Sequence, residues 1–288
     1  MNDAVGPGFA AQPAPRCHRH PDQPAWVRCQ RCDRPVCLAC QVPAAVGVQC
    51  PDCVRQARRQ LPVARSALGA PISGGAPVVT ITMIGLCVVV FVAQQVVGGV
   101  TSDLILAPGA AWRQPWRMVT AAFLHAGVLH LAFNMYALWV VGSFMEQLLG
   151  RSRLAALYLG SALGGHVLVL AYFRVFEFNW EGALTGTLGA SGAVFGLFAA
   201  ALVAGRRLGS NINGIVGVVV LNLVLSFTLP GISWQGHVGG LIAGGAMALA
   251  YVHAPPAWRR RVAWLAPAAV AALTALVMVV TVSPLTWG

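Results

Sequence analysis

Charged residues are scarce in this sequence, and lysine is absent. Only 9% of the 288 residues are charged, and all 19 basic residues are arginine, against eight aspartates and glutamates. Apolar residues make up 57% of the chain, and its mean hydropathy is +0.70. A soluble domain of this length needs more polar surface than this composition supplies. The sequence therefore excludes an ordinary soluble enzyme and predicts an integral membrane protein.

The amino terminus also lacks a secretory signal, because no cationic stretch leads into a short apolar core and a cleavage site. It begins polar and proline-rich and then enters a cysteine cluster. We expect it to be retained. The composition divides the chain into a disordered tail (1–15), a zinc-binding module (16–54), a basic linker (55–77) and a transmembrane domain (78–288).

Seven apolar segments follow the linker, each near the roughly 20 residues that cross a bilayer. They cover residues 78–97, 127–148, 152–173, 190–205, 212–229, 236–253 and 262–282. Arginines gather before the first segment and in the turns near residues 151, 206 and 259, and the loops between are sparser in arginine. Because arginine-rich loops stay in the cytoplasm, we expect a multi-pass protein, of a bacterial plasma membrane, with its amino terminus inside and its carboxy terminus outside.

This topology places three polar residues in one leaflet. His130, Ser191 and His237 lie near the starts of the second, fourth and sixth spans, which all run inward. Polar groups at membrane depth are costly unless they face the bundle interior or a wet cavity. Each is therefore a candidate functional residue.

Ser191 lies in Gly189-Ala190-Ser191-Gly192, where glycines allow a sharp turn that leaves the hydroxyl and nearby N–H groups uncovered. A loop that meets a helix amino terminus can hold an oxyanion. Small residues with serine are also common at helix contacts in membranes. The motif by itself therefore fits both catalysis and packing.

His237 begins a helix with little bulk on one face, because Gly240 and Gly244 follow it. The fourth span carries Gly192 and Gly196 at the same spacing. Two such faces let helices approach closely, which would bring the imidazole within reach of the serine as its general base. Alone, this histidine would equally fit a satisfied interior residue.

Carboxylates that could orient this histidine are missing. The acidic residues after position 77 are Asp103, Glu177 and Glu181 in external loops and Glu146 near the cytoplasmic end of the second span. A soluble serine protease orients its histidine with a carboxylate. The sequence therefore predicts a Ser191/His237 dyad.

His130 and Asn134 are spaced i, i+4 and share one helical face at the depth of Ser191. They could donate hydrogen bonds to a developing oxyanion. Alternatively, the two residues form hydrogen bonds between helices and only hold the bundle together.

These motifs together resemble one family. In order along the chain they are Trp116-Arg117, His130-xxx-Asn134, Gly189-x-Ser191-Gly192 and His237-xx-Gly240-xxx-Gly244. Over roughly residues 78 to 253 they resemble a rhomboid intramembrane protease. The resemblance implies an all-α membrane protein with a six-helix rhomboid core, and the last span resembles the seventh, carboxy-terminal helix of some members.

The resemblance also implies residue roles. Ser191 would be the nucleophile and His237 the general base and acid, while His130, Asn134 and the backbone at Ser191 would form the oxyanion hole. Catalysis would need no cofactor, and the substrate would be a single-span membrane protein cut near the outer interface, where helix-weakening residues matter.

Supporting positions follow from the same resemblance. Trp116 and Arg117 would lie in a long first external loop of residues 98–126, Glu146 would be structural, and the loop before His237, with Pro230 and Trp234, resembles a cap that admits water and substrate. Two positions depart from the commonest pattern, because Phe195 stands where the family often has tyrosine under the histidine and Gly236 replaces alanine.

Seven of the eight cysteines lie in the amino-terminal module. With one histidine they form four pairs: Cys17-xx-His20, Cys29-xx-Cys32, Cys37-xx-Cys40 and Cys50-xx-Cys53. Eight ligands suffice for two structural zinc ions, whereas a disulfide framework would need an oxidising compartment. The order resembles a B-box zinc finger, with cross-braced or sequential pairing, and His18 could replace His20.

Two further classes of protein remain as alternatives: an inactive rhomboid-like protein that binds transmembrane helices, and a zinc-finger scaffold anchored by an unrelated bundle. The expected partners are transmembrane substrates, membrane lipids and a cytoplasmic protein for the zinc module. Nucleic acid is not expected, because the module's arginines are interleaved with acidic residues.

Overall fold

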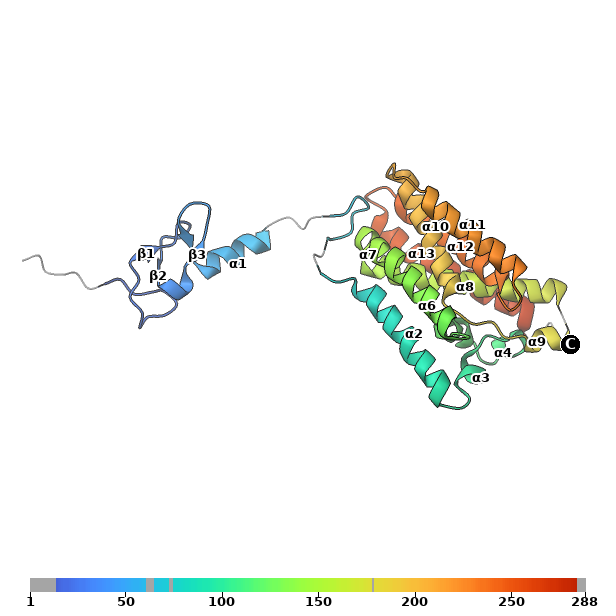
Figure 1. Ribbon diagram of the computed structural model, residues 1–288. Helices are drawn as coiled ribbons and strands as arrows, with labels where there is room; N and C mark the ends of the chain where they lie inside the picture. The colour runs from blue at the N-terminus through green and yellow to red at the C-terminus, as the bar shows by residue number, and fades with distance from the viewer. Residues whose placement is uncertain (1–13, 61–64, 73–74, 178, 284–288) are drawn as a thin grey trace, which may run out of the picture. The chain divides into compact units, whose positions relative to one another are not determined.

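The computed structural model describes residues 14–60, 65–72, 75–177 and 179–283 (Figure 1). The chain divides into two compact units, Met1–Val63 and Ala64–Gly288. All but two residues of the predicted tail fall outside the described residues.

The amino-terminal unit is built from very short elements. Strand β1 (Val27–Arg28) pairs antiparallel with β2 (Pro35–Val36), and β3 (Val42–Pro43) pairs antiparallel with β4 (Val48–Gln49). The turn η1 (Leu38–Cys40) and helix α1 (Pro51–Gln60) complete it. Cysteines supply most of its buried core. So small a core needs metal or another cross-link to be stable.

Helix α1 carries the module past the predicted boundary at residue 54. Asp52 lies in its first turn and two arginines lie in its last, so its charges complement the helix dipole. Within the predicted linker, Ser66 Oγ donates to the Leu148 carbonyl at 2.7 Å, and Leu68 is buried. The arginine, proline and glycine content of residues 55–77 is typical of a linker and does not indicate either feature.

The carboxy-terminal unit has a helix in each of the seven predicted apolar segments. These are α2 (Val78–Val96); the continuous helix Val128–Leu149, made of α6 (Val128–Ala137), a π-helical turn η3 (Leu138–Gly142) and α7 (Ser143–Leu149); α8 (Arg151–Phe176); α10 (Ser191–Arg207); α11 (Asn213–Thr228); α12 (Trp234–His253); and α13 (Arg259–Val282). The predicted first loop contains α3 (Val100–Leu104), α4 (Pro108–Ala111), α5 (Arg117–Thr120) and η2 (Ala121–Phe123), and α9 (Trp180–Leu184) follows α8.

Four of these helices are long and apolar enough to cross a membrane: α2, Val128–Leu149, α8 and α13. Their outward faces are apolar, as Val89 on α2 and Leu265 on α13 illustrate. Helices α10 and α11 have 17 and 16 residues, and α12 is rich in glycine. The predicted helical membrane protein is confirmed, and the crossing of all seven helices stays a prediction.

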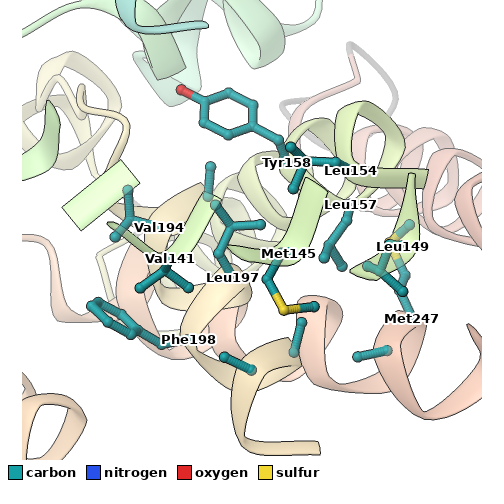
Figure 2. Packing of buried hydrophobic residues seen from close by; sticks show 14 of the residues in the cluster. Val141, Met145, Leu149, Leu154, Leu157, Tyr158, Val194, Leu197, Phe198 and Met247 are labelled. Carbon is teal, nitrogen blue, oxygen red and sulfur yellow. The ribbon is translucent and has the colours of Figure 1, made fainter. Parts of the chain in front are cut away.

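Helices α8, α10 and α12 lie side by side at the centre of this unit (Figure 1). Figure 2 shows the apolar side chains that fill the space between them and the Val128–Leu149 helix, including Val141, Met145, Leu154, Leu157, Val194, Leu197 and Met247. Helix α10 is buried continuously from Ala193 to Ala201. A helix covered by protein needs no lipid-facing bulk, so small residues serve there.

The two predicted glycine faces meet. A Cβ atom added at Gly240 would lie 2.1 Å from the Gly192 carbonyl oxygen, and one at Gly244 would lie 2.3 Å from Gly196 Cα. Helix α8 forms a third close contact, because a Cβ at Gly165 would lie 2.6 Å from the Gly236 carbonyl oxygen. The backbones of α8, α10 and α12 therefore approach one another where no side chain fits.

We expect Gly240→Ala to destabilise the bundle by about 1–3 kcal/mol, because the new methyl group meets backbone that cannot rotate away. Thermal unfolding of the purified protein in detergent measures the change. The matched control is Gly217→Ala in α11, where no atom lies within 4 Å of the added Cβ. An unfolding midpoint for Gly240→Ala equal to that of the control would contradict the close packing.

Candidate active site and metal-ligand clusters

Ser191 is the first residue of α10 and follows a turn that only glycine readily adopts. Gly189 has φ +129°, and a Cβ there would lie 2.9 Å from His130 Cε1. The Gly189 N–H donates to the Ala121 carbonyl at 2.9 Å, so the turn is tied to the end of the first loop. The sequence motif thus puts the hydroxyl at a helix amino terminus, where backbone N–H groups are unpaired.

His237 lies in the first turn of α12 and faces this serine. Ser233 caps the helix by accepting from the Gly236 N–H at 3.3 Å. The His237 ring is 9% exposed, and its Nε2 lies 2.7 Å from Ser191 Oγ. This distance is a hydrogen bond and is within the reach that a general base requires.

Phe195 fixes the plane of this ring. It lies one turn beyond Ser191 on α10 and stacks on His237, with ring centroids 4.4 Å apart and an interplanar angle of 16°. Stacking holds the imidazole against its neighbour without any hydroxyl on the aromatic ring. The phenylalanine therefore supplies the packing that the resemblance expected from a tyrosine.

A third polar residue, Ser226 on α11, was missed in the sequence. Its Oγ lies 2.6 Å from His237 Nδ1, on the side of the ring opposite Ser191. Asn222 and Ser226 are polar positions one turn apart in an otherwise apolar span, which is the available signal. The packing of α11 on α12 decides the contact, and periodicity alone does not give that packing.

The predicted oxyanion residues lie beside the serine turn. A Cβ placed at Gly189 would be 3.2 Å from His130 Nε2 and 3.6 Å from Ser191 Oγ. Both atoms therefore lie close to the same position beside Gly189. Asn134 is buried, and its Nδ2 donates to the His130 carbonyl at 2.9 Å. An asparagine amide has a second N–H, which leaves one donor for another acceptor.

The remaining predicted residues brace the scaffold. Glu146 accepts from the backbone N–H groups of Val79 and Thr80, at 3.0 and 2.9 Å, and so caps α2. Arg117 is buried and donates to the carbonyls of Ser102 and Ile105 at 2.6 and 2.7 Å, which closes the first loop on itself. Its neighbour Trp116 is half exposed, at 51%.

Two details were absent from the sequence reading. His166 on α8 is buried, and its Nδ1 lies 2.7 Å from the Met118 carbonyl, so it joins the central helix to the first loop. Trp234 is the first residue of α12 and not part of the loop before it; its ring packs 5.1 Å from Phe227 of α11, between centroids. The His166 contact joins elements that are distant in sequence, and the Trp234 contact joins two helices across a turn.

The eight predicted metal ligands gather in two groups of four. The groups are Cys17, His20, Cys37 and Cys40, and Cys29, Cys32, Cys50 and Cys53. Within each group the ligand atoms all lie within 4.8 Å of one another. This is the cross-braced pairing and not the sequential one.

The spacing inside the groups suits a tetrahedral zinc ion. Zn–S bonds of about 2.3 Å put tetrahedral sulfur atoms about 3.8 Å apart, and Cys32 Sγ and Cys50 Sγ are 3.8 Å apart. His20 Nδ1 lies 3.3 Å from both Cys37 Sγ and Cys40 Sγ. His18 points elsewhere, with its Nε2 3.1 Å from Asp52, so it does not replace His20.

Backbone donors prepare thiolates in both groups. Burial raises the pKa of the Cys17 thiol, but N–H groups led by that of Cys37 outweigh it and lower the pKa from 9.0 to about 6. The Cys29 pKa also falls to about 6, because the N–H groups of Cys50, Arg31 and Cys32 outweigh its burial. A thiol with such a pKa is mostly ionised at neutral pH, the form that binds metal.

Comparison with known proteins identifies the helical unit. Residues 112–254 match the Rhomboid domain family. This range includes Ser191, His237 and the residues around them. The chain is 33% identical to the rhomboid protease GluP of Bacillus subtilis over 67% of this chain and 38% of the relative, and 29% identical to the rhomboid protease AarA of Providencia stuartii over 65% and 76%. It is 32% identical to the rhomboid protease GlpG of Serratia proteamaculans over 59% of this chain and 61% of the relative.

The predicted family, read first from four short motifs, is confirmed by these matches. The chain spans less than two thirds of the length of two of these three relatives, and the zinc-ligand groups lie outside the matched domain. Family membership rests on the helical unit, whose matched range includes Ser191 and His237. Residues 112–254 of this chain are therefore a Rhomboid domain, and the relatives that it resembles are named as rhomboid proteases.

Proposed function

We propose that this protein is an intramembrane serine endopeptidase in which Ser191 and His237 form the catalytic dyad. The observation that carries the proposal is the 2.7 Å contact between Ser191 Oγ and His237 Nε2 inside a membrane bundle. Polar side chains are energetically costly at membrane depth, and a catalytic role accounts for the presence of both residues there. The named rhomboid proteases among the relatives support the same chemistry.

The reaction follows from this geometry. His237 Nε2 takes the hydroxyl proton as Ser191 Oγ attacks a peptide carbonyl, and the resulting imidazolium gives that proton to the leaving amine. Water then attacks the acyl carbonyl and gives a proton to the same nitrogen, which returns it to Ser191 Oγ as the bond from that oxygen to the acyl carbon breaks. Catalysis needs no cofactor, because the two side chains supply both nucleophile and proton transfer.

The developing oxyanion would be held by donors around the serine turn. The unpaired N–H groups at the start of α10 and its helix dipole favour negative charge there. His130 and the free N–H of Asn134 would add side-chain donors, which is consistent with their position beside Gly189. This arrangement stabilises a tetrahedral intermediate without a metal.

The proposed substrate is a single-span membrane protein cut near the outer interface. Ser191 and His237 both lie at the first turn of their helices, and Arg206 and Arg207 lie at the other end of α10. Positive residues stay on the cytoplasmic side, so the dyad would lie in the outer leaflet. A substrate helix must unwind there to free its carbonyls from i, i+4 hydrogen bonds.

The amino-terminal module would bind two structural zinc ions and recruit a cytoplasmic protein partner. The two cross-braced ligand groups support this assignment. The ions would hold the module folded and would take no part in peptide hydrolysis. A bacterial plasma membrane with the amino terminus inside and the carboxy terminus outside is the corresponding location.

We expect Ser191→Ala and His237→Ala each to lower cleavage of a single-span reporter in liposomes by roughly four to six orders of magnitude, because the dyad acts as a unit. Gel analysis of product against time measures the loss. Cys37→Ser serves as the control and should cleave at the wild-type rate. Continued cleavage by the Ser191 variant would reject the dyad mechanism. A wild type that does not cleave the reporter would instead favour an inactive helix binder or a scaffold.

Metal analysis of the purified full-length chain should find two zinc ions per molecule. Cys37→Ser and Cys50→Ser should each reduce this to about one, because each removes a ligand from a different group. Cys87→Ser, which changes the buried cysteine of α2, should keep two. Equal zinc content in all four proteins would contradict the assignment.

Orientation can be tested by single-cysteine labelling with a membrane-impermeant maleimide. A cysteine at Ile232, in the turn before α12, should react in intact cells. A cysteine at Leu208, at the arginine-rich end of α10, should react only after the membrane is opened. The reverse pattern would overturn the proposed topology and the outer-leaflet position of the dyad.

A further inference from the structure

A chain of three hydrogen bonds connects Ser191 to α11 by way of the ring of His237. Its Nε2 lies 2.7 Å from Ser191 Oγ, and its Nδ1 lies 2.6 Å from Ser226 Oγ. Ser226 Oγ in turn lies 2.5 Å from the carbonyl oxygen of Asn222, one turn earlier in α11. The chain of contacts therefore ends on a backbone group whose role is fixed, because a carbonyl only accepts.

That carbonyl sets the direction of every proton in the chain. Ser226 has one hydroxyl proton, and it is donated to Asn222. Its remaining lone pairs can only accept, so Nδ1 of His237 carries the ring proton and donates to Ser226. A neutral imidazole then has its lone pair on Nε2, which must accept from the hydroxyl of Ser191.

The opposite arrangement is unfavourable at both ends. If Ser226 donated to Nδ1, its oxygen and the Asn222 carbonyl would face each other, lone pair to lone pair, across 2.5 Å. The ring proton would then be on Nε2, and that nitrogen could not remove a proton from Ser191. The wrong tautomer of a catalytic histidine costs a soluble serine protease about 10⁴ in kcat.

We infer that Ser226 is a positioning residue that fixes the tautomer and rotation of His237, in the place where soluble serine proteases use a carboxylate. This inference rests on the proposed function of the Ser191/His237 pair. A hydroxyl does the task without burying a negative charge, which is costly in a membrane bundle.

The packing of α11 is consistent with this role. Val219 and Ser226 are the buried residues of this helix, and their spacing of seven puts them on one face. Most of its other side chains are exposed apolar groups suited to lipid. Phe227 packs on Trp234 next to this contact, which holds the end of α11 against the start of α12.

The stacked phenylalanine and the serine restrain different motions of the ring. Phe195 lies against its face and fixes its plane, but a stacked ring can still turn within that plane or carry its proton on either nitrogen. Ser226 removes both freedoms because it accepts from one nitrogen only. Together they leave Nε2 pointing at Ser191 with its lone pair free.

Ser226→Ala tests this inference in the full-length protein. We expect kcat for reporter cleavage to fall about 10-fold or more with KM unchanged, because the variant loses a hydrogen bond to the ring but no substrate contact. The rate at which a fluorophosphonate labels Ser191 should fall by the same factor. This second readout needs no substrate helix.

Two variants separate positioning from packing. Ser226→Thr keeps the hydroxyl and its bond to the i−4 carbonyl, so it should recover most of both rates. Thr228→Ala is the matched control: Thr228 makes the same kind of i−4 bond, to Val224 at 2.9 Å, but lies exposed. It should match the wild type in both rates and in unfolding temperature.

The outcomes are distinct. Wild-type kcat and labelling in Ser226→Ala, or equal losses in the Ala and Thr variants together with lower unfolding temperatures, would overturn the positioning role. A wild-type chain that neither cleaves nor reacts with the probe would instead reject the proposed function, and this inference with it. Loss in the Ala variant with recovery in the Thr variant at unchanged stability supports it.

Discussion

The contact between α10 and α12 is the constraint on which the site depends. Ser191 and His237 are 46 residues apart and lie on different helices, so their side chains meet only if the two backbones approach almost to van der Waals contact. Gly192 and Gly196 on one helix and Gly240 on the other make this approach feasible. Lipid offers no hydrophobic drive for helices to associate, so close packing and its many small dispersion contacts must hold them together.

In this bundle, Glu146 and His237 are both held by hydrogen bonds to neutral groups, and Arg151 Nε also lies 3.8 Å from Glu146 Oε1. Glu146, the carboxylate buried among the helices described here, is engaged by backbone N–H groups at the start of α2. Around the histidine, a serine hydroxyl and a stacked ring replace a carboxylate. A buried ion is expensive unless it is fully satisfied, whereas a hydroxyl can donate and accept in sequence at far lower cost. This low cost would let the proposed protease operate among helices that face lipid.

Different interactions stabilise the two units of the chain. The helical unit buries a large apolar core, and its central helices need little beyond small side chains. The amino-terminal unit has a core made largely of cysteines, and backbone N–H groups lower the pKa of one thiol in each ligand group, Cys17 and Cys29. Coordination bonds can stabilise a chain segment too small to fold by burial alone.

The sequence by itself indicated the apolar segments, the cysteine and histidine pairs and the candidates Ser191 and His237, because each depends on local composition or on spacing along one helix. It did not reveal α1 beyond residue 54 or the packing of residues 65–72, since the arginine, proline and glycine content of these residues is typical of a linker. It also missed Ser226, because a serine in an apolar helix gains meaning only from what lies opposite it. Tertiary structure alone decided that contact, since the rotation of α11 against α12 is set by how their faces pack and not by any pattern within either helix.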